Sequence, residues 1–131
     1  MKIIVFFLLL FNLHVFADEL QVKPRVDRPV LNENFVVDFI IHTSESGEPL
    51  INFNPIGVEV IDRGPTETST RVTIINGERT MERTLTVSYE LLPKKQGFIY
   101  LQNIEVEING KILKHKTINL NVLKEPLETK K

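Results

Sequence analysis

Apolar residues recur at every second position over long stretches of this chain, and this alternation limits the fold more than any other feature. Between residues 34 and 43 the apolar set is Phe35, Val37, Phe39 and Ile41. Successive side chains of a β-strand point to opposite faces, so these four residues predict one buried face of a sheet. No helical spacing of comparable strength follows residue 17. The pattern therefore predicts an all-β protein.

The dipeptide Asn76-Gly77 lies between two strand-like runs and predicts a two-residue type I′ hairpin. That turn sets Ile75 opposite Glu78, and counting outward gives the pairs Ile74–Arg79, Val72–Met81 and Arg71–Glu82. The apolar parity continues from Met81 through Leu85, Val87, Tyr89 and Leu91. We therefore expect the Met81 side of this hairpin to be the core side and the Arg71–Glu82 side to face water.

A second Asn-Gly dipeptide, Asn109-Gly110, predicts another hairpin. Its expected pairs are Ile108–Lys111, Val106–Leu113, Glu105–Lys114 and Ile104–His115. The inward parity then changes from Leu113 to Ile118, which places a bulge or break within residues 114–117. Between the hairpins, residues 91–98 predict a turn that crosses from one sheet to the other, with Pro93 at its entry and Gly97 at its exit.

Prolines interrupt the alternating pattern at two places in the first half of the chain. Pro24 interrupts the apolar run that begins at Leu20, which predicts an edge strand or a bulge. Asn54-Pro55 predicts a turn before a further alternating run. About seven to eight short strands in roughly 100 residues predict an immunoglobulin-like antiparallel β-sandwich, with an open barrel as the alternative. The chain has no Trp and no Cys, so the conserved core of antibody-type domains is missing.

Residues 1–17 have the features of a secretory signal peptide. Lys2 precedes a short apolar run, and Val15 and Ala17 are small residues at the positions before a cleavage site. We expect cleavage between Ala17 and Asp18, the alternative being an uncleaved N-terminal anchor. The expected organisation is a signal peptide (1–17), one sandwich domain (18–123) and a charged, frayed tail (124–131). The predicted location is periplasmic or secreted, as a soluble protein without a membrane span after cleavage.

Charge and composition exclude several classes of function. The expected mature chain has 15 basic and 17 acidic residues, which gives no basic field for nucleic acid. The absence of Cys removes disulfides, thiolate metal sites and cysteine nucleophiles. The fold must therefore be stabilised by its core alone.

Five segments in order resemble the N-terminal repeat of the BatD family, the exported oxygen tolerance proteins of bacterial aerotolerance operons. They are residues 26–35, 57–61, 74–77, 89–97 and 106–111, within a likeness that runs from Val26 to Val122. Members of that family look like several immunoglobulin-like domains followed by a membrane anchor, so we expect this chain to be a single-domain relative. The resemblance implies envelope partners with von Willebrand-type domains and a cytoplasmic ATPase of the MoxR class.

The sequence predicts no catalytic, cofactor or metal site. His42 and His115 lack the spacing of a metal site, and we expect both to be ordinary strand residues. His42 near Ser44 and Ser46 suggests a small exported hydrolase only weakly, because neither serine lies in a Gly-x-Ser-x-Gly elbow. We therefore expect a protein that is not an enzyme.

Binding surfaces remain as the candidate functional features. Phe53 and Ile56 flank the expected Asn54-Pro55 turn, where they are either core plugs at one end of the sandwich or partner contacts. Lys94 and Lys95 are either solvated or matched by an acidic partner. The leading hypothesis is a non-enzymatic protein–protein interaction module of an envelope complex. The alternative is an exported carbohydrate-binding or adhesin-like sandwich, which would need exposed aromatic residues for stacking.

Overall fold

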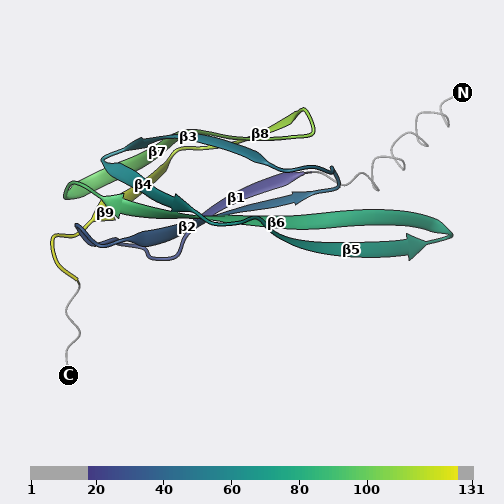
Figure 1. Cartoon of the computed structure of the whole chain (residues 1–131), viewed down its shortest axis with the longest axis horizontal. Coiled ribbons are helices and arrows are strands. Elements are labelled where there is room, and N and C mark those ends of the chain that lie inside the picture. The colour runs from purple at the N-terminus through teal and green to yellow at the C-terminus, as the bar shows by residue number, and fades with distance from the viewer. Residues whose placement is uncertain (1–17, 127–131) are drawn as a thin grey trace, which may run out of the picture.

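The computed structural model describes residues 18–126, so the predicted signal peptide (1–17) lies outside the described residues. Two facing sheets form the domain (Figure 1). The first has five strands, namely β1 (Glu19–Pro24), β2 (Phe35–Thr43), β4 (Val58–Arg63), β5 (Glu67–Ile75) and β6 (Glu78–Pro93). The second has four, namely β3 (Leu50–Ile56), β7 (Gly97–Ile108), β8 (Lys111–His115) and β9 (Ile118–Val122). The predicted all-β sandwich is confirmed.

The long strands β6 and β7 each pair with three other strands of their sheet. In the first sheet the order is β1-β2-β6-β4, and β5 pairs with the part of β6 that precedes its contact with β4. In the second sheet β7 pairs with β3 along one edge and with β8 and then β9 along the other. All these ladders are antiparallel, and an isolated parallel bridge joins Val30 to Leu123. The expected edge strand with Pro24 is β1, which pairs with β2 alone.

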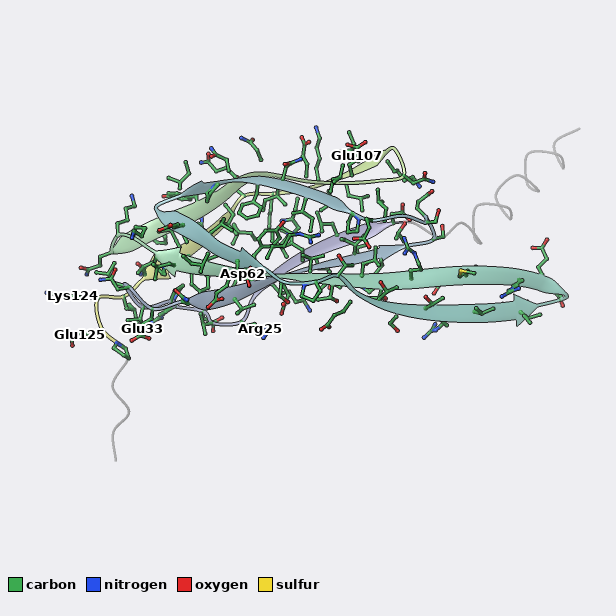
Figure 2. All side chains as sticks on the ribbon, in the orientation of Figure 1. Arg25, Glu33, Asp62, Glu107, Lys124 and Glu125 are labelled. Atoms are coloured by element: carbon green, nitrogen blue, oxygen red, sulfur yellow. The ribbon has the colours of Figure 1, made fainter. Side chains whose placement is uncertain are left out.

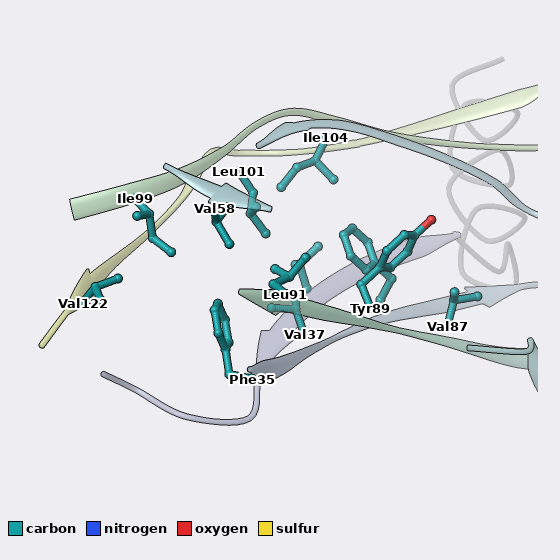
Figure 3. Close-up of a cluster of buried hydrophobic side chains, with 12 residues drawn as sticks. Phe35, Val37, Val58, Val87, Tyr89, Leu91, Ile99, Leu101, Ile104 and Val122 are labelled. Carbon is teal, nitrogen blue, oxygen red and sulfur yellow. The ribbon is translucent and has the colours of Figure 1, made fainter. Parts of the chain in front are cut away.

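The core lies between the sheets and is filled from both inner faces (Figure 3). On β2, Val37, Phe39 and Ile41 are fully buried while the residues between them are half-buried, as the alternation predicted. β6 shows the same alternation from Leu85 to Leu91. Burial of each such aliphatic or aromatic side chain contributes about 1.5–3 kcal/mol to stability, and this interior is the main favourable contribution to a fold without disulfides.

Both Asn-Gly hairpins have the predicted registers. Ile75 pairs with Glu78, Val72 with Met81 and Arg71 with Glu82 in the first hairpin. In the second, Ile108 pairs with Lys111, Val106 with Leu113 and Ile104 with His115. All four turn residues have positive φ, from 50° at Asn109 to 80° at Gly77 and Gly110, as a type I′ turn requires. The predicted break follows β8, which ends at His115 before β9 begins at Ile118.

The prediction of a turn at Asn54-Pro55 was wrong. Both residues lie within β3, which pairs with β7 through a register shift between Asn52 and Asn54. The turn comes later, at Gly57, where φ is 78°. Pro55 is compatible with β3 because β3 is an edge strand beside a register shift, the places in a sheet where proline is tolerated. The described residues form nine strands rather than seven or eight, because residues 50–75 form β3, β4 and β5.

The prediction that the Met81 side of the first hairpin faces the core was wrong for the outer half of the hairpin. Val72 and Met81 are each 45% exposed, because the hairpin extends beyond the second sheet (Figure 1). A second parity slip, which the sequence did not indicate, lies within β7. Leu101 and Ile104 are both buried, and Asn103 between them has a φ of 53°. This irregularity lets odd residues before it and even residues after it face the same core.

Candidate interaction surface

Two turns meet at one end of the sandwich and form the candidate surface. The β3–β4 turn centres on Gly57, and the β6–β7 turn contains Lys94, Lys95 and Gln96. The backbone N–H of Lys94 donates to the carbonyl of Gly57 at 2.9 Å, so the turns are directly joined. A Cβ on Gly57 would lie 2.8 Å from Ile99 Cγ2 and 2.9 Å from Lys95 Cε. The absence of a side chain at Gly57 therefore lets Lys95 lie across the β3–β4 turn.

This contact brings three of the four sequence-predicted site residues together. Ile56 is 36% exposed immediately before Gly57, and Lys94 and Lys95 are exposed on the adjoining turn. Lys94 Nζ lies 3.6 Å from Glu59 Oε1, with both side chains more than half exposed. Such an exposed pair leaves most of the lysine's charge available to a partner. The result is a small basic surface with an apolar residue beside it.

Phe53 does not join this surface. Its ring stacks on Phe39 with the centroids 5.4 Å apart, and it meets Tyr89 edge-on at 5.2 Å. Phe39 and Tyr89 contact each other at 5.2 Å, so the three rings link both sheets across the core. Phe53 is half-buried and packs against the main core cluster.

A short aromatic row lies on the outer face of the second sheet. Phe98 is 53% exposed, and Tyr100 stands two residues further along β7 on the same face, half-buried. In the β7–β9 ladder, Asn121 is opposite Phe98 and Asn119 is opposite Tyr100. Aromatic rings with neighbouring amides are the chemistry that stacks on sugar rings and hydrogen-bonds to their hydroxyls.

The outer face of the first sheet holds a polar cluster that sequence reasoning missed. Arg25 donates from Nε and Nη2 to the two carboxylate oxygens of Asp38, at 2.9 and 3.0 Å, and Ser88 Oγ donates to the same carboxylate. The hydrogen bonds from Arg25 lower the pKa of Asp38, and the carboxylate in turn raises the pKa of Arg25. Figure 2 shows Arg25 and Asp62 on this sheet, where both line a shallow depression beside Ser88. The sequence does not indicate that Arg25 and Asp38 form a pair, because they are far apart in the chain. The antiparallel pairing of β1 with β2 brings them together.

This polar cluster has no residue arranged for catalysis. The Asp38 carboxylate is fully engaged by Arg25 and Ser88, and no histidine is among its hydrogen-bond partners. His42 instead lies 3.2 Å from the Thr84 hydroxyl, and His115 contacts the carbonyl of Lys116. Within residues 18–126 no group of three or more His, Asp or Glu side chains is placed to hold a metal ion.

Of the two residues at the expected cleavage site, Ala17 lies outside the described residues, and Asp18 is the first described. The Asp18 side chain is 3% exposed, and its Oδ2 lies 3.1 Å from Lys111 Nζ at the start of β8. Lys111 Nζ also lies 3.6 Å from Glu45 Oε2. The two carboxylates raise the pKa of Lys111, Asp18 foremost. The start of β1 is therefore tied to the β7–β8 hairpin. In the described part of the chain, no helix has the length and apolar character to cross a membrane.

The domain has two facing antiparallel sheets and no disulfide. It is therefore a β-sandwich domain of the non-antibody type. Residues 23–122 match the family model described as the BatD DUF11 like domain, and the chain therefore belongs to the BatD family. Searches of curated proteins and of solved structures found no match. Membership indicates an aerotolerance-associated envelope protein.

Proposed function

We propose that this protein is an exported, non-enzymatic interaction domain that works in the periplasm or beyond as part of an envelope complex, or as its modulator. The observation that carries the proposal is the joined pair of turns that presents Ile56 beside Lys94 and Lys95. An apolar residue flanked by two lysines fits a partner surface with an apolar centre and an acidic rim. As the resemblance to the BatD family implies, the partners in this proposal are envelope proteins with von Willebrand-type domains.

Lys94 and Lys95 would contribute to binding mainly through their charge. Rim charges of this kind mainly steer encounter and suppress wrong partners, and their effect falls with ionic strength. The apolar contact at Ile56 would supply the part of the affinity that salt leaves unchanged. Binding should therefore weaken with added salt without disappearing.

Site-specific photocrosslinking in cells tests the proposal. A photoreactive residue is placed at Lys95, and the captured proteins are identified by mass spectrometry. A matched probe at Lys114 is the control, because its side chain is 74% exposed on β8, far from the β6–β7 turn (Figure 1). Capture of an envelope protein with a von Willebrand-type domain from position 95 and not from position 114 supports the proposal. Equal capture from both positions, or capture from neither, contradicts it.

A charge-reversal pair gives the second arm of the test. Lys94→Glu combined with Lys95→Glu should abolish the capture, whereas Lys114→Glu should leave it unchanged. Both variants change exposed side chains, so circular dichroism should report the same β-rich fold for each.

Carbohydrate binding is the second candidate, and the row of Phe98 and Tyr100 opposite Asn121 and Asn119 favours it. The ring of Phe98 is accessible for stacking, but Tyr100 is only half-exposed, so the platform is small. Titration with envelope glycans separates the two candidates. A saturable response that Phe98→Ala removes and the Lys94/Lys95 reversal leaves intact would move the function to glycan binding.

A further inference from the structure

The outer half of the β5–β6 hairpin is a two-stranded arm that leaves the body of the sandwich (Figure 1). We define the arm as residues 71–82. β2 pairs with β6 only as far as Arg83, which is opposite Thr43. Arg83 also donates to the carbonyls of Glu45 and Gly47, which fixes the β2–β3 loop at the base of the arm. Beyond that base, β5 and β6 pair only with each other among the described residues.

The arm exposes apolar side chains on the face that continues the core side of the sheet. Val72 and its partner Met81 are each 45% exposed, and Ile74 is 69% exposed. An isolated two-stranded ribbon is marginal in water, and an exposed apolar stripe on one marks an interaction site. In Figure 2 the side chains of the arm point into open space, whereas those of the sandwich body fill the gap between the sheets.

The free edge of β5 has backbone groups available for pairing. Ile75 and Glu78 flank the two-residue turn and form a hydrogen-bonded pair, so alternate residues of β5 direct their backbone groups away from β6. Those residues are Thr70, Val72 and Ile74. Their N–H and C=O groups are an open template for another strand.

Four other outer strands carry features that oppose such pairing. They are Pro24 in β1, Pro55 with a bulge in β3, a bulge between Val60 and Asp62 in β4, and Lys111 with Lys114 in β8. Proline, bulges and lysines are the usual protection of a sheet edge. Residues 68–75 of β5 contain no proline and a single charge, Arg71. The edge of the arm therefore has none of these protections. β9 (Ile118–Val122) also lacks proline and charge, but it is only five residues long and the chain directly after it is hydrogen-bonded to residues 29–31 through Leu123.

We propose that the occupant of this edge is a second copy of the chain, paired antiparallel through β5 about a two-fold axis at Val72. In this register Val72 of each copy is opposite Val72 of the other, and Thr70 is opposite Ile74. These are the residues whose backbone groups point outward, so both strands present complementary hydrogen-bonding groups. The exposed apolar faces of the two arms then merge into one surface.

Charge excludes one competing register and does not oppose a second copy as the occupant. Moving the pairing by one residue on each chain would set Arg71 against Arg71 of the second copy, a like-charge contact that destabilises a sheet. With the axis at Val72, Arg71 is instead opposite Thr73. Between residues 71 and 82 the arm has two arginines and two glutamates, so two copies approach without net repulsion. The arm is thus self-complementary in backbone, apolar pattern and charge.

Cysteine crosslinking of the full chain, processed and purified from the envelope, tests the register. Directly opposed residues in a hydrogen-bonded antiparallel pair have Cα atoms about 5.5 Å apart, within the disulfide range. The chain has no native Cys, so Val72→Cys introduces the sole thiol. We expect rapid oxidation to a covalent dimer with Val72→Cys and at least tenfold slower dimerisation with Thr80→Cys, which lies on β6. Equal rates at both positions would overturn the register.

Sedimentation equilibrium tests the dimer itself. We expect a reversible monomer–dimer equilibrium in the micromolar to millimolar range, weakened about tenfold or more by Val72→Lys, which opposes two lysines across the axis. Thr80→Lys adds the same charge to the same arm away from the pairing edge and should leave the dimer unchanged. A wild-type chain that stays monomeric at millimolar concentration, or that engages the edge only with a strand of another envelope protein, would overturn the proposal. None of these variants touches Lys94 or Lys95, so this result is independent of the proposed partner surface.

Discussion

Arg25 and Asp38 form a two-pronged ion pair on the outer face of the first sheet, with N–O distances of 2.9 and 3.0 Å. The pair joins the segment after β1 to β2, and Ser88 of β6 donates a third hydrogen bond to the same carboxylate. Because Arg25 is more than half exposed, water screens the pair, and its main effect is to fix the chain where β1 ends.

Asp38→Asn should lower the free energy of unfolding by about 1 kcal/mol at pH 7, since the amide keeps the shape but loses the charge that Arg25 and Ser88 satisfy. The pKa of Asp38 is lower in the folded state than in the unfolded chain. Its stabilisation is therefore complete above about pH 4, the unfolded value, and is lost as the pH falls toward the folded pKa. Urea unfolding at several pH values measures this.

The control for that series is Asp27→Asn, at an exposed position on the next turn. Asp27→Asn should change stability by less than about 0.5 kcal/mol at any pH. A difference between wild type and Asp38→Asn that stays constant from pH 7 to pH 3 would show that the charge of Asp38 contributes nothing.

Phe53→Ala should destabilise the domain by about 2–4 kcal/mol, because it removes the ring that stacks on Phe39 and meets Tyr89 across the core. Phe98→Ala deletes the same group from a site that is 53% exposed and should cost about 1 kcal/mol or less. Thermal or urea unfolding followed by circular dichroism compares the two. If the costs are equal, Phe53 does not have the core role that its contacts indicate.

Local turn chemistry and side-chain alternation were sufficient to predict much of this fold. The registers at Asn76-Gly77 and Asn109-Gly110 follow from a two-residue turn, which leaves a single way to pair the flanking residues. The break after His115 followed from a change of parity. These features depend on residues close together in sequence.

Features that depend on distant segments were not predicted. Pro55 resembles a turn residue, and only its place in an edge strand makes it compatible with β3. Met81 shares the parity of Leu85, but its exposure is set by where the second sheet ends. For the candidate surface, the sequence predicted Ile56, Lys94 and Lys95 separately. Their meeting depends on Gly57, whose role requires knowing that Ile99 and Lys95 lie against it.

Gly57→Ala tests the junction between the two turns. An added Cβ would lie 2.8 Å from Ile99 Cγ2, and φ at this position is 78°, so both a clash and backbone strain are expected. The control is Gly47→Ala, where φ is 103° and no atom lies within 4 Å of the added Cβ. Gly57→Ala should therefore cost about 1–3 kcal/mol more than Gly47→Ala, as overpacking of a core does. Similar losses would show that φ strain alone acts at Gly57.

Export is tested by changing the expected cleavage site. Signal peptidase requires a small residue immediately before the cut, so Ala17→Arg should block processing and leave a precursor that retains residues 1–17. The wild-type protein from the envelope fraction should begin at Asp18, which N-terminal sequencing and intact mass can establish. Val26→Ala, an exposed change within the domain, is the matched control and should be processed normally. A full-length wild-type protein in the envelope fraction would instead identify residues 1–17 as an uncleaved anchor, and the partner experiments would then be made on the tethered form.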